Sequence, residues 1–339
     1  MTEREQLRTS FIATTSWRNA EVLPLAGDAS NRKYLRLEMT DGRSAVLMDA
    51  PPDKGENIRP FIQIALYLRS LGLSAPQIFE HDEVHGFLLL EDLGDALFAR
   101  ILEHQPELEI TLYTAAVDVL FELHKHDAPA FLQHYAPDMM TEMSSLAFDW
   151  YLRGIRGADC AAKDTFMTAM KSALSRIEPK TVLIQRDYHA ENLLWLPDRA
   201  GFGNVGLLDF QDAMSGHPAY DLVSLLQDAR RDVSKAVETS MIELYIKTCN
   251  CDADQFRADY QILGAQRNLR ILGVFARLCL RDGKSHYVDL IPRVWDHLMA
   301  DLMCPALADV AGVVQNSLPP PTQVNLKVLK EKCAAIQNL

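Results

Sequence analysis

The sequence has no apolar run long enough to cross a membrane, and this absence first limits its class. Even the stretch 271–280 is interrupted by Arg277, whereas a membrane-spanning helix needs about 20 apolar residues. The N-terminal residues also lack the charged and then apolar layout of a secretory signal. With 48% hydrophobic and 24% charged residues, the composition is typical of a soluble globular protein. We therefore expect a cytoplasmic protein with no membrane partner.

Paired cysteines and excess positive charge are also missing. Six cysteines occur at positions 160, 249, 251, 279, 304 and 333, without C-x-x-C units or histidines at zinc spacing, so we expect free thiols. The formal net charge is −12, which argues against a general nucleic-acid surface because binding a phosphate backbone relies on Lys and Arg. A local positive site for ATP stays compatible with that charge.

The segment from Ile184 to Asp209 carries two acids and an amide at the ends of apolar runs. Short buried strands are predicted at residues 181–184, 193–196 and 205–208, with a turn at 197–204. Asp187, Asn192 and Asp209 then lie at strand ends. We expect the three side chains to surround one cleft.

This pattern suits phosphoryl transfer. The reaction needs a carboxylate that orients the acceptor hydroxyl and accepts its proton, together with Mg²⁺ on the phosphates. Because Mg²⁺ takes oxygen ligands and few protein groups, we assign Asp187 as the base and Asn192 and Asp209 as metal ligands. Taken singly, each residue is more typical of a turn or a cap; the three together favour a kinase.

The same residues carry a family resemblance. Arg-Asp-x-x-x-x-Asn at 186–192, followed by a strand-borne Asp-Phe, resembles kinase catalytic and metal motifs. The sequence 208–213, with Gly216 and 220–222, is similar to the aminoglycoside and choline phosphotransferase superfamily, although Gln185 replaces its usual His. Within that superfamily the chain most resembles the anomeric N-acetylmuramate and N-acetylglucosamine kinases of bacterial cell-wall recycling. The similar segments are residues 27–30, 48–52, 220–226 and 271–277.

The resemblance implies an α+β, two-lobed, protein-kinase-like fold. A small antiparallel-sheet lobe would cover residues 1–91, a mainly helical catalytic and substrate lobe 92–316, and a helical tail 317–339. The segment after the apolar strand 87–90 would be the hinge, where the backbone at Glu91 and Leu93 holds adenine. ATP and Mg²⁺ are the implied cofactors, and the implied partner is a small-molecule acceptor, an amino sugar above all.

The segment 25–34 is the predicted phosphate loop. Gly27 permits a close backbone approach, and Asp28, Ala29, Ser30 and Asn31 are small or polar, so that their N–H groups can point at phosphate oxygens. An ordinary hairpin is the alternative, since strands are predicted at 34–39 and 44–49.

Kinase-like folds usually have a Lys on the second of these strands, and Met48 takes its place here. The phosphate charge still needs a cation. Arg32 and Arg36 alternate with Tyr34 on one strand face, so we hypothesise that Arg32 replaces the Lys, with Arg36 second.

The helical part offers further candidates. Residues 260–282 carry Arg267, Arg270, Arg277 and Arg281 on one helical stripe, which we interpret as a solvated basic face, with contact to an anionic substrate group as the alternative. Asp221 precedes an apolar run and is expected to cap a helix. His124 is expected to be a hydrogen-bonded structural histidine.

These patterns predict ATP-dependent phosphorylation of a small-molecule hydroxyl, most closely the anomeric hydroxyl of an N-acetylated amino sugar. Aminoglycoside, choline-like and homoserine-like acceptors stay open, because a fold fixes the donor chemistry better than the acceptor. A non-catalytic nucleotide-binding pseudokinase is the alternative from another class, suggested by the missing strand Lys. Formation of a phosphorylated product distinguishes the two.

Overall fold

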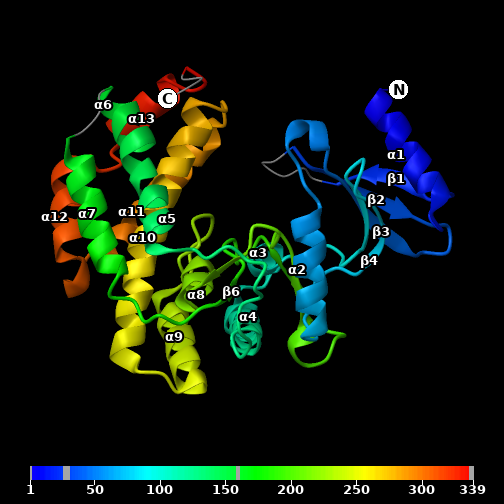
Figure 1. The fold of residues 1–339 in the computed structure, drawn as a ribbon, viewed down its shortest axis with the longest axis horizontal. Coiled ribbons are helices and arrows are strands. Elements are labelled where there is room, and N and C mark those ends of the chain that lie inside the picture. Colours follow the sequence, from blue (N-terminus) through cyan, green and yellow to red (C-terminus); the bar gives the residue numbers. More distant parts are fainter. Residues whose placement is uncertain (1, 26–30, 158–160, 336–339) are drawn as a thin grey trace. The chain divides into compact units, whose positions relative to one another are not determined.

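A computed structural model describes residues 2–25, 31–157 and 161–335. By its internal contacts the chain forms two compact units. The first comprises residues 1–119 and 190–213, and the second comprises 120–189 and 214–339. Figure 1 labels the elements of each unit. The expected α+β fold, with an antiparallel sheet followed by a mainly helical region, is confirmed.

The first unit is built on an antiparallel sheet, which among the described residues has five strands in the order β1-β2-β3-β5-β4. Its strands are β1 (Glu21–Pro24), β2 (Lys33–Glu38), β3 (Ser44–Asp49), β4 (Ile78–Asp82) and β5 (Phe87–Glu91). The predicted hairpin is present as β2 and β3, whose register pairs Tyr34 with Met48. Gly42 takes φ +85° in the connecting turn, a conformation that glycine adopts without steric cost. The second strand pairing sets Met48 against Leu88 of β5, and Met48 is 1% exposed.

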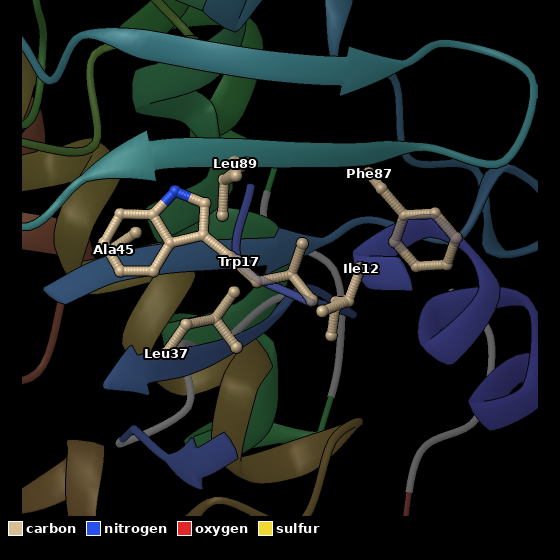
Figure 2. Close-up of a cluster of buried hydrophobic side chains, with 7 residues drawn as sticks. Ile12, Trp17, Leu37, Ala45, Phe87 and Leu89 are labelled. Carbon is tan, nitrogen blue, oxygen red and sulfur yellow. The ribbon is translucent and has the colours of Figure 1, made fainter. Parts of the chain in front are cut away.

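Helix α1 (Glu3–Thr14) begins with a capping box in which the Thr2 and Glu5 side chains bond each other's backbone N–H groups. Its inner side joins the sheet in one apolar cluster (Figure 2), formed by Ile12, Trp17, Leu37, Ala45, Leu47, Phe87 and Leu89. Burying these large side chains supplies the main driving force for folding this unit.

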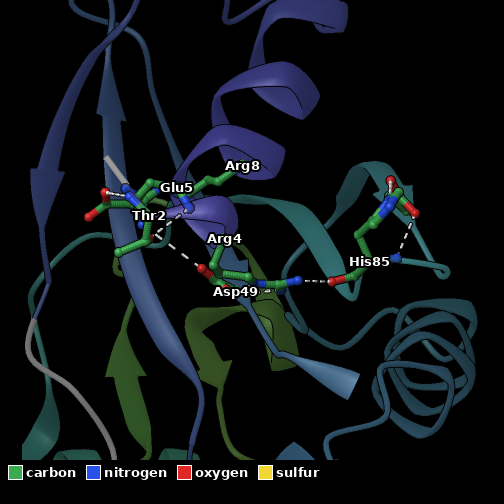
Figure 3. A network of polar contacts seen from close by, with 7 residues as sticks. Thr2, Arg4, Glu5, Arg8, Asp49 and His85 are labelled. Atoms are coloured by element: carbon green, nitrogen blue, oxygen red, sulfur yellow. Dashed lines mark hydrogen bonds and ion pairs between the residues drawn. The ribbon is translucent and has the colours of Figure 1, made fainter. Parts of the chain in front are cut away.

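Asp49, at the end of β3, attaches helix α1 to the sheet (Figure 3). Arg4 donates to Asp49 Oδ1 through Nε (2.8 Å) and Nη2 (2.6 Å), and its Nη1 donates to the carbonyl of His85. The Arg4 guanidinium also lies 4.1 Å from the centre of the Phe87 ring. Within the segment 48–52, which carries part of the family resemblance, Asp49 therefore has a structural role in holding α1 on the sheet.

The rest of the first unit supports the end of the sheet. It contains α2 (Arg59–Ser70), α3 (Phe98–His104), most of α4 (Glu109–Leu123), and the strand pair β7 (Leu193–Trp195) and β8 (Val205–Leu207). The helices predicted at 57–71 and around 112–123, and the strands predicted at 193–196 and 205–208, are present within a few residues.

The second unit is mainly helical. Its α-helices are α5 (Pro137–Leu146), α6 (Arg153–Arg156), α7 (Ala162–Leu174), α8 (Ala219–Leu226), α9 (Lys235–Cys249), α10 (Ala253–Leu280), α11 (Ile291–Asp301), α12 (Ala308–Ser317) and α13 (Gln323–Glu331). A π-helical stretch, η3 (Ala147–Leu152), follows α5, and β6 (Val182–Ile184) pairs with β9 (Met214–Gly216).

Helix α10 is the centre of the second unit, where it contacts α5, α8, α11 and η3. Two glycines allow this crowding. A Cβ at Gly264 would collide with the Asp301 carboxylate, and one at Gly273 would collide with the backbone of Leu146. The close approach of α11 and α5 to α10 thus requires glycine at these two positions.

Among the described residues, no single helix is long and apolar enough to span a membrane. Two consecutive helical segments, Ser285–Asp301 and Pro305–Ser317, have the length and composition of a membrane span only when they are taken together. They meet at a bend of 106°. The five cysteines within the described residues are free thiols; Cys160 lies outside them.

His124, as expected, is a buried structural histidine. It is 6% exposed, and its Nδ1 lies 2.8 Å from Tyr245 Oη. Burial lowers its pKa from 6.5 to about 3. Between these values the unfolded chain binds a proton that the folded chain does not, so this group destabilises the fold as the pH falls through that window.

We expect His124→Gln to remove this contribution. Its free energy of unfolding should fall less steeply than the wild type's between about pH 7 and about pH 5, by up to about 1.4 kcal/mol per pH unit. Chemical unfolding at the two pH values measures the difference, with the exposed His126→Gln as control. Equal slopes for wild type and His124→Gln would contradict this assignment.

Candidate functional site

The first unit contains a pocket of about 340 Å³ beside the end of the sheet. Its walls come from β2, β3, the segment after β5, the start of α3 and the β7–β8 region. Its apolar side chains include Val46, Leu90, Leu93, Leu194 and Leu208, and its polar ones include Arg36, Asp92, Asn192 and Asp209. A pocket lined by apolar side chains together with a few polar and charged ones suits a small ligand that combines an apolar ring with a charged group.

The β7–β8 pair brings Asn192 and Asp209 to this pocket. Leu193 pairs with Leu207, and the N–H of Leu208 donates to the carbonyl of Asn192 (3.0 Å). Asn192 and Asp209 therefore flank the same end of one strand pair, as the sequence predicted. Both contribute oxygen atoms, the ligand type that Mg²⁺ prefers.

Asp209 is held in an uncommon conformation. Its φ is +54°, in the left-handed region that a non-glycine residue adopts at a cost. The next residue, Phe210, is fully buried and its ring centre lies 4.8 Å from that of Phe61. Gln211 Nε2 donates to Asp209 Oδ1 (2.7 Å). Packing on one side and a hydrogen bond on the other thus fix the direction of the carboxylate.

The predicted phosphate loop is described only in part, since Gly27, Asp28, Ala29 and Ser30 lie outside the described residues. Asn31 is attached to the turn after β3, because its N–H donates to Glu56 Oε1 (3.1 Å) and its Nδ2 to the carbonyl of Lys54 (3.3 Å). Arg32 lies close to two carboxylates. Its Nε is 3.4 Å from Glu56 Oε2, and its Nη1 is 4.0 Å from Asp209 Oδ1.

Arg36 lines the pocket, but its guanidinium binds two carboxylates. Its Nε lies 2.7 Å from Asp92 Oδ2, and its Nη1 lies 2.8 Å from Asp95 Oδ2. The hydrogen bond to Asp95 raises the pKa of Arg36 further, against the effect of burial. Of the two cations proposed to replace the missing Lys, Arg32 is therefore the one beside Asp209.

Glu91 and Leu93 both line the pocket, as predicted for a hinge. The Glu91 side chain is also structural, because its Oε1 binds Arg199 (2.6 Å) and its Oε2 accepts from the N–H of Gln77 (3.0 Å). Its own N–H donates to the carbonyl of Gln77 (2.8 Å). The Glu91 N–H is therefore already used in a backbone hydrogen bond at the edge of the sheet.

Asp187 belongs to the second unit, in the segment that follows β6. Burial would raise the pKa of its carboxyl, but nearby positive charges, of which Arg270 contributes most and Arg267 is one, together outweigh burial and hold the pKa below its ordinary value. Asp187 is therefore ionised at neutral pH. An ionised carboxylate is the form that can accept a proton.

Asp221 supports the segment before Asp187, and the expected helix-capping role is wrong. It lies inside α8 and is fully buried. Its Oδ2 accepts from the N–H of Gln185 (2.6 Å) and its Oδ1 from the N–H of Arg186 (2.8 Å). Burial raises the pKa of Asp221 to about 7, although these two donors act in the opposite direction.

The interpretation of the arginine stripe as a solvated face is also wrong for its first members. Arg267 is 3% exposed, and Arg270 and Arg277 are only partly exposed. Only Arg281, at the end of α10, is exposed. The stripe is inward because α10 is covered on several sides, so a spacing that resembles an amphipathic helix instead directs charge toward Asp187.

The comparisons with known proteins agree with this geometry. Residues 21–258 match the model of the phosphotransferase enzyme family. The chain belongs to that family. Its similar relatives include an N-acetylmuramate/N-acetylglucosamine kinase of Caulobacter vibrioides, 35% identical over 95% of this chain and 98% of the relative. Another of the same name, from Pseudomonas aeruginosa, is 33% identical over 88% of this chain and 89% of the relative.

Solved structures share the fold at lower identity. An ethanolamine kinase of Plasmodium vivax has a TM-score of 0.62 at 13% identity, covering 88% of both chains. A choline kinase of Streptococcus pneumoniae has 0.59 at 16%, covering 88% of this chain and 100% of the other. An aminoglycoside phosphotransferase of Streptomyces rimosus, in complex with ADP and streptomycin, has 0.52 at 15%, covering 80% and 99%.

Membership of the phosphotransferase family makes the chain an ATP-dependent small-molecule kinase, as the sequence predicted. Sequence reasoning missed one supporting residue of this kinase and misread another. Ser224 of α8 donates to the carbonyl of Arg186. Arg267 of α10, which the sequence placed only in the basic stripe, donates to Ser224. The available signal was a Ser inside the apolar run 222–226 and an Arg flanked at i−4, i−3 and i+4 by Leu263, Gly264 and Ile271.

Proposed function

We propose that this kinase transfers the γ-phosphoryl group of ATP, with Mg²⁺, to the anomeric hydroxyl of an N-acetylated amino sugar. The observation that carries the acceptor is the similarity over nearly the full length to relatives named N-acetylmuramate/N-acetylglucosamine kinase. The pocket with Asn192 and Asp209, and the ionised Asp187, support the donor chemistry.

Asp187 is the proposed base. Its carboxylate accepts a hydrogen bond from the acceptor hydroxyl, orients the oxygen toward phosphorus, and takes the proton as the new P–O bond forms. The bond from the γ-phosphorus to the bridging oxygen breaks, and ADP leaves. Because Arg267 and Arg270 keep Asp187 ionised, the base is ready before the acceptor binds.

The donor set fits Mg²⁺. Asn192 and Asp209 supply two oxygen ligands, and the described residues contain no group of three or more His, Cys, Asp or Glu that could hold a metal alone. Such a small protein share is typical of Mg²⁺, which completes its shell with water and substrate phosphates. When bound, the ion neutralises phosphate charge.

Arg32, within 4.0 Å of Asp209, is the proposed replacement for the strand Lys, and Arg36 stays the second candidate. Residues 27–31 would cover the phosphates, and the backbone at Glu91 and Leu93 would hold adenine. The lobe boundaries near residues 91 and 316, and a cytoplasmic location with a role in cell-wall recycling, remain predictions.

Asp187→Asn tests the base. The amide keeps the size of the side chain but cannot take the proton, so kcat should fall by a factor on the order of 10² to 10⁴ while the Kd for ATP changes little. Steady-state kinetics and calorimetry measure the two quantities. The exposed Asp198→Asn serves as the isosteric control. Retained kcat within about tenfold would remove Asp187 from this role.

Asp209→Asn tests the metal ligand. Replacing a carboxylate oxygen with an amide weakens the attraction for Mg²⁺, so the Mg²⁺ concentration for half-maximal activity should rise and ATP binding in Mg²⁺ should weaken together. The matched control is the exposed Asp212→Asn. An unchanged Mg²⁺ titration for Asp209→Asn would show that the ligand assignment is wrong.

The acceptor is tested by kcat/KM for N-acetylmuramate, N-acetylglucosamine, glucose and kanamycin. A site that hydrogen-bonds an acetamido group leaves its own polar groups unpaired with analogues that lack it, so glucose should be at least about 100-fold poorer. Phosphate at C1 of the product, located by NMR, identifies the hydroxyl. A preference for kanamycin would overturn the sugar acceptor, and no product from any acceptor would favour the pseudokinase.

A further inference from the structure

The residue before the proposed base has an unusual backbone conformation. Arg186 has φ +74°, in the left-handed region where the Cβ of a non-glycine residue is crowded. Its position directly precedes Asp187, so its dihedral angles set the direction in which the Asp187 side chain leaves the backbone. Something in the fold has to hold this conformation against its preference for ordinary ones.

Helix α8 holds both polar groups of the Arg186 backbone. The N–H donates to Asp221 Oδ1 (2.8 Å), and the carbonyl accepts from Ser224 Oγ (3.2 Å). Residues three apart lie on the same face of a helix, so Asp221 and Ser224 approach the segment together. A rotation of Arg186 back to an ordinary conformation would break at least one of these bonds.

Arg267 determines the direction in which the Ser224 hydroxyl points. Its Nη2 donates to Ser224 Oγ (2.8 Å). A hydroxyl has one hydrogen and two lone pairs, so a donor on the oxygen leaves the hydrogen for the carbonyl of Arg186. Without that donor the hydroxyl is free to turn toward another acceptor, such as the backbone of its own helix.

Arg267 is placed at considerable cost for a structural residue. Its side chain is 3% exposed, and among the described residues its Nε and Nη1 have no hydrogen-bond partner. Burying a guanidinium that is only partly hydrogen-bonded is unfavourable for stability, although the charges of Asp187 and Asp228 offset part of the cost. Its hydrogen bond to Ser224 leads to the backbone beside Asp187.

We propose that Ser224 and Arg267 are positioning residues, which form a relay from α10 through α8 that holds Arg186 in the left-handed conformation and so orients Asp187. The relay rests on the proposed function, because it serves Asp187 as the base. Arg267 touches no reacting atom in this role; it acts through Ser224 and the Arg186 backbone.

The first test compares Ser224→Ala, Arg267→Met and Arg267→Lys. Ser224→Ala and Arg267→Met should lower kcat on the order of 10- to 100-fold, since small misplacements of a catalytic group have effects of this size, with KM for ATP nearly unchanged. Arg267→Lys keeps a donor and a charge and should recover part of kcat. Ser145→Ala is the control, because Ser145 is buried and its hydroxyl donates within its own helix.

Hydrogen–deuterium exchange gives a readout that needs no acceptor. The peptide covering residues 182–189 should exchange faster in Ser224→Ala than in wild type and in Ser145→Ala. Faster exchange without loss of kcat would leave a merely structural contact and overturn the proposal. Loss of kcat with unchanged exchange would also overturn it. If no sugar is phosphorylated by the wild type, the proposed function fails, and exchange still decides whether the relay holds the segment.

Combining Ser224→Ala with Arg186→Gly decides whether the relay acts through the conformation of residue 186. Glycine takes the left-handed conformation without the steric cost, so the relay is less needed there. Ser224→Ala should then reduce kcat, relative to Arg186→Gly, by less than about threefold, against 10- to 100-fold in the wild-type background. An equal loss in both backgrounds would overturn the relay. If Arg267→Met does not fold, the Ser224→Ala cycle alone decides.

Discussion

The hydrogen bonds that α8 makes to the Arg186 backbone are the constraint on which the catalytic side of this kinase depends. Asp221 and Ser224 hold the N–H and carbonyl of a residue that would not stay in its conformation unaided. Both bonds require the segment before Asp187 to pass over the inner face of α8. Burial raises the pKa of the Asp221 carboxyl to about 7, against the effect of its two backbone donors. Each bond also satisfies a backbone group that would be costly to bury unpaired.

Helix α10 supports the contact between α8 and the Arg186 backbone through Arg267. Glycine at 264 and 273 lets α11 and α5 approach it closely, and this crowding turns Arg267 inward instead of toward water. The same guanidinium contributes to the low pKa of Asp187 and donates to Ser224. One buried charge thus acts on the proposed base in two ways, through its electric field and, in the proposed relay, through the backbone. Packing and catalysis are coupled here because moving α10 changes both.

Much of the fold and part of the site could be predicted from the sequence, for local reasons. The β2–β3 hairpin follows from alternating side chains around Gly42, and Asp187, Asn192 and Asp209 stand beside short apolar strands whose ends are legible in the chain. Asp221 and Arg267 were misread because their roles depend on what packs against them. A carboxylate before an apolar run is compatible both with helix capping and with hydrogen bonding to the backbone of another segment. A stripe of arginines is likewise compatible with a solvated helix face and with a buried one. Periodicity gives the face of a helix but does not say what covers it.

The phosphoryl donor and the acceptor also differ in how much of their recognition can be predicted from local sequence. The proposed donor pocket is built by strand pairing and by the segment after β5, so that residues near in sequence or in register line it. Its cations illustrate the limit of that logic. Arg36 on β2 pairs with Asp92 and Asp95, whereas Arg32, just before β2, lies near Glu56 and Asp209. Two arginines close together in the sequence thus acquire different electrostatic roles from the carboxylates that the fold brings to them. Phosphoryl-transfer chemistry is therefore readable from short motifs, whereas the proposed sugar acceptor rests on similarity over nearly the whole chain.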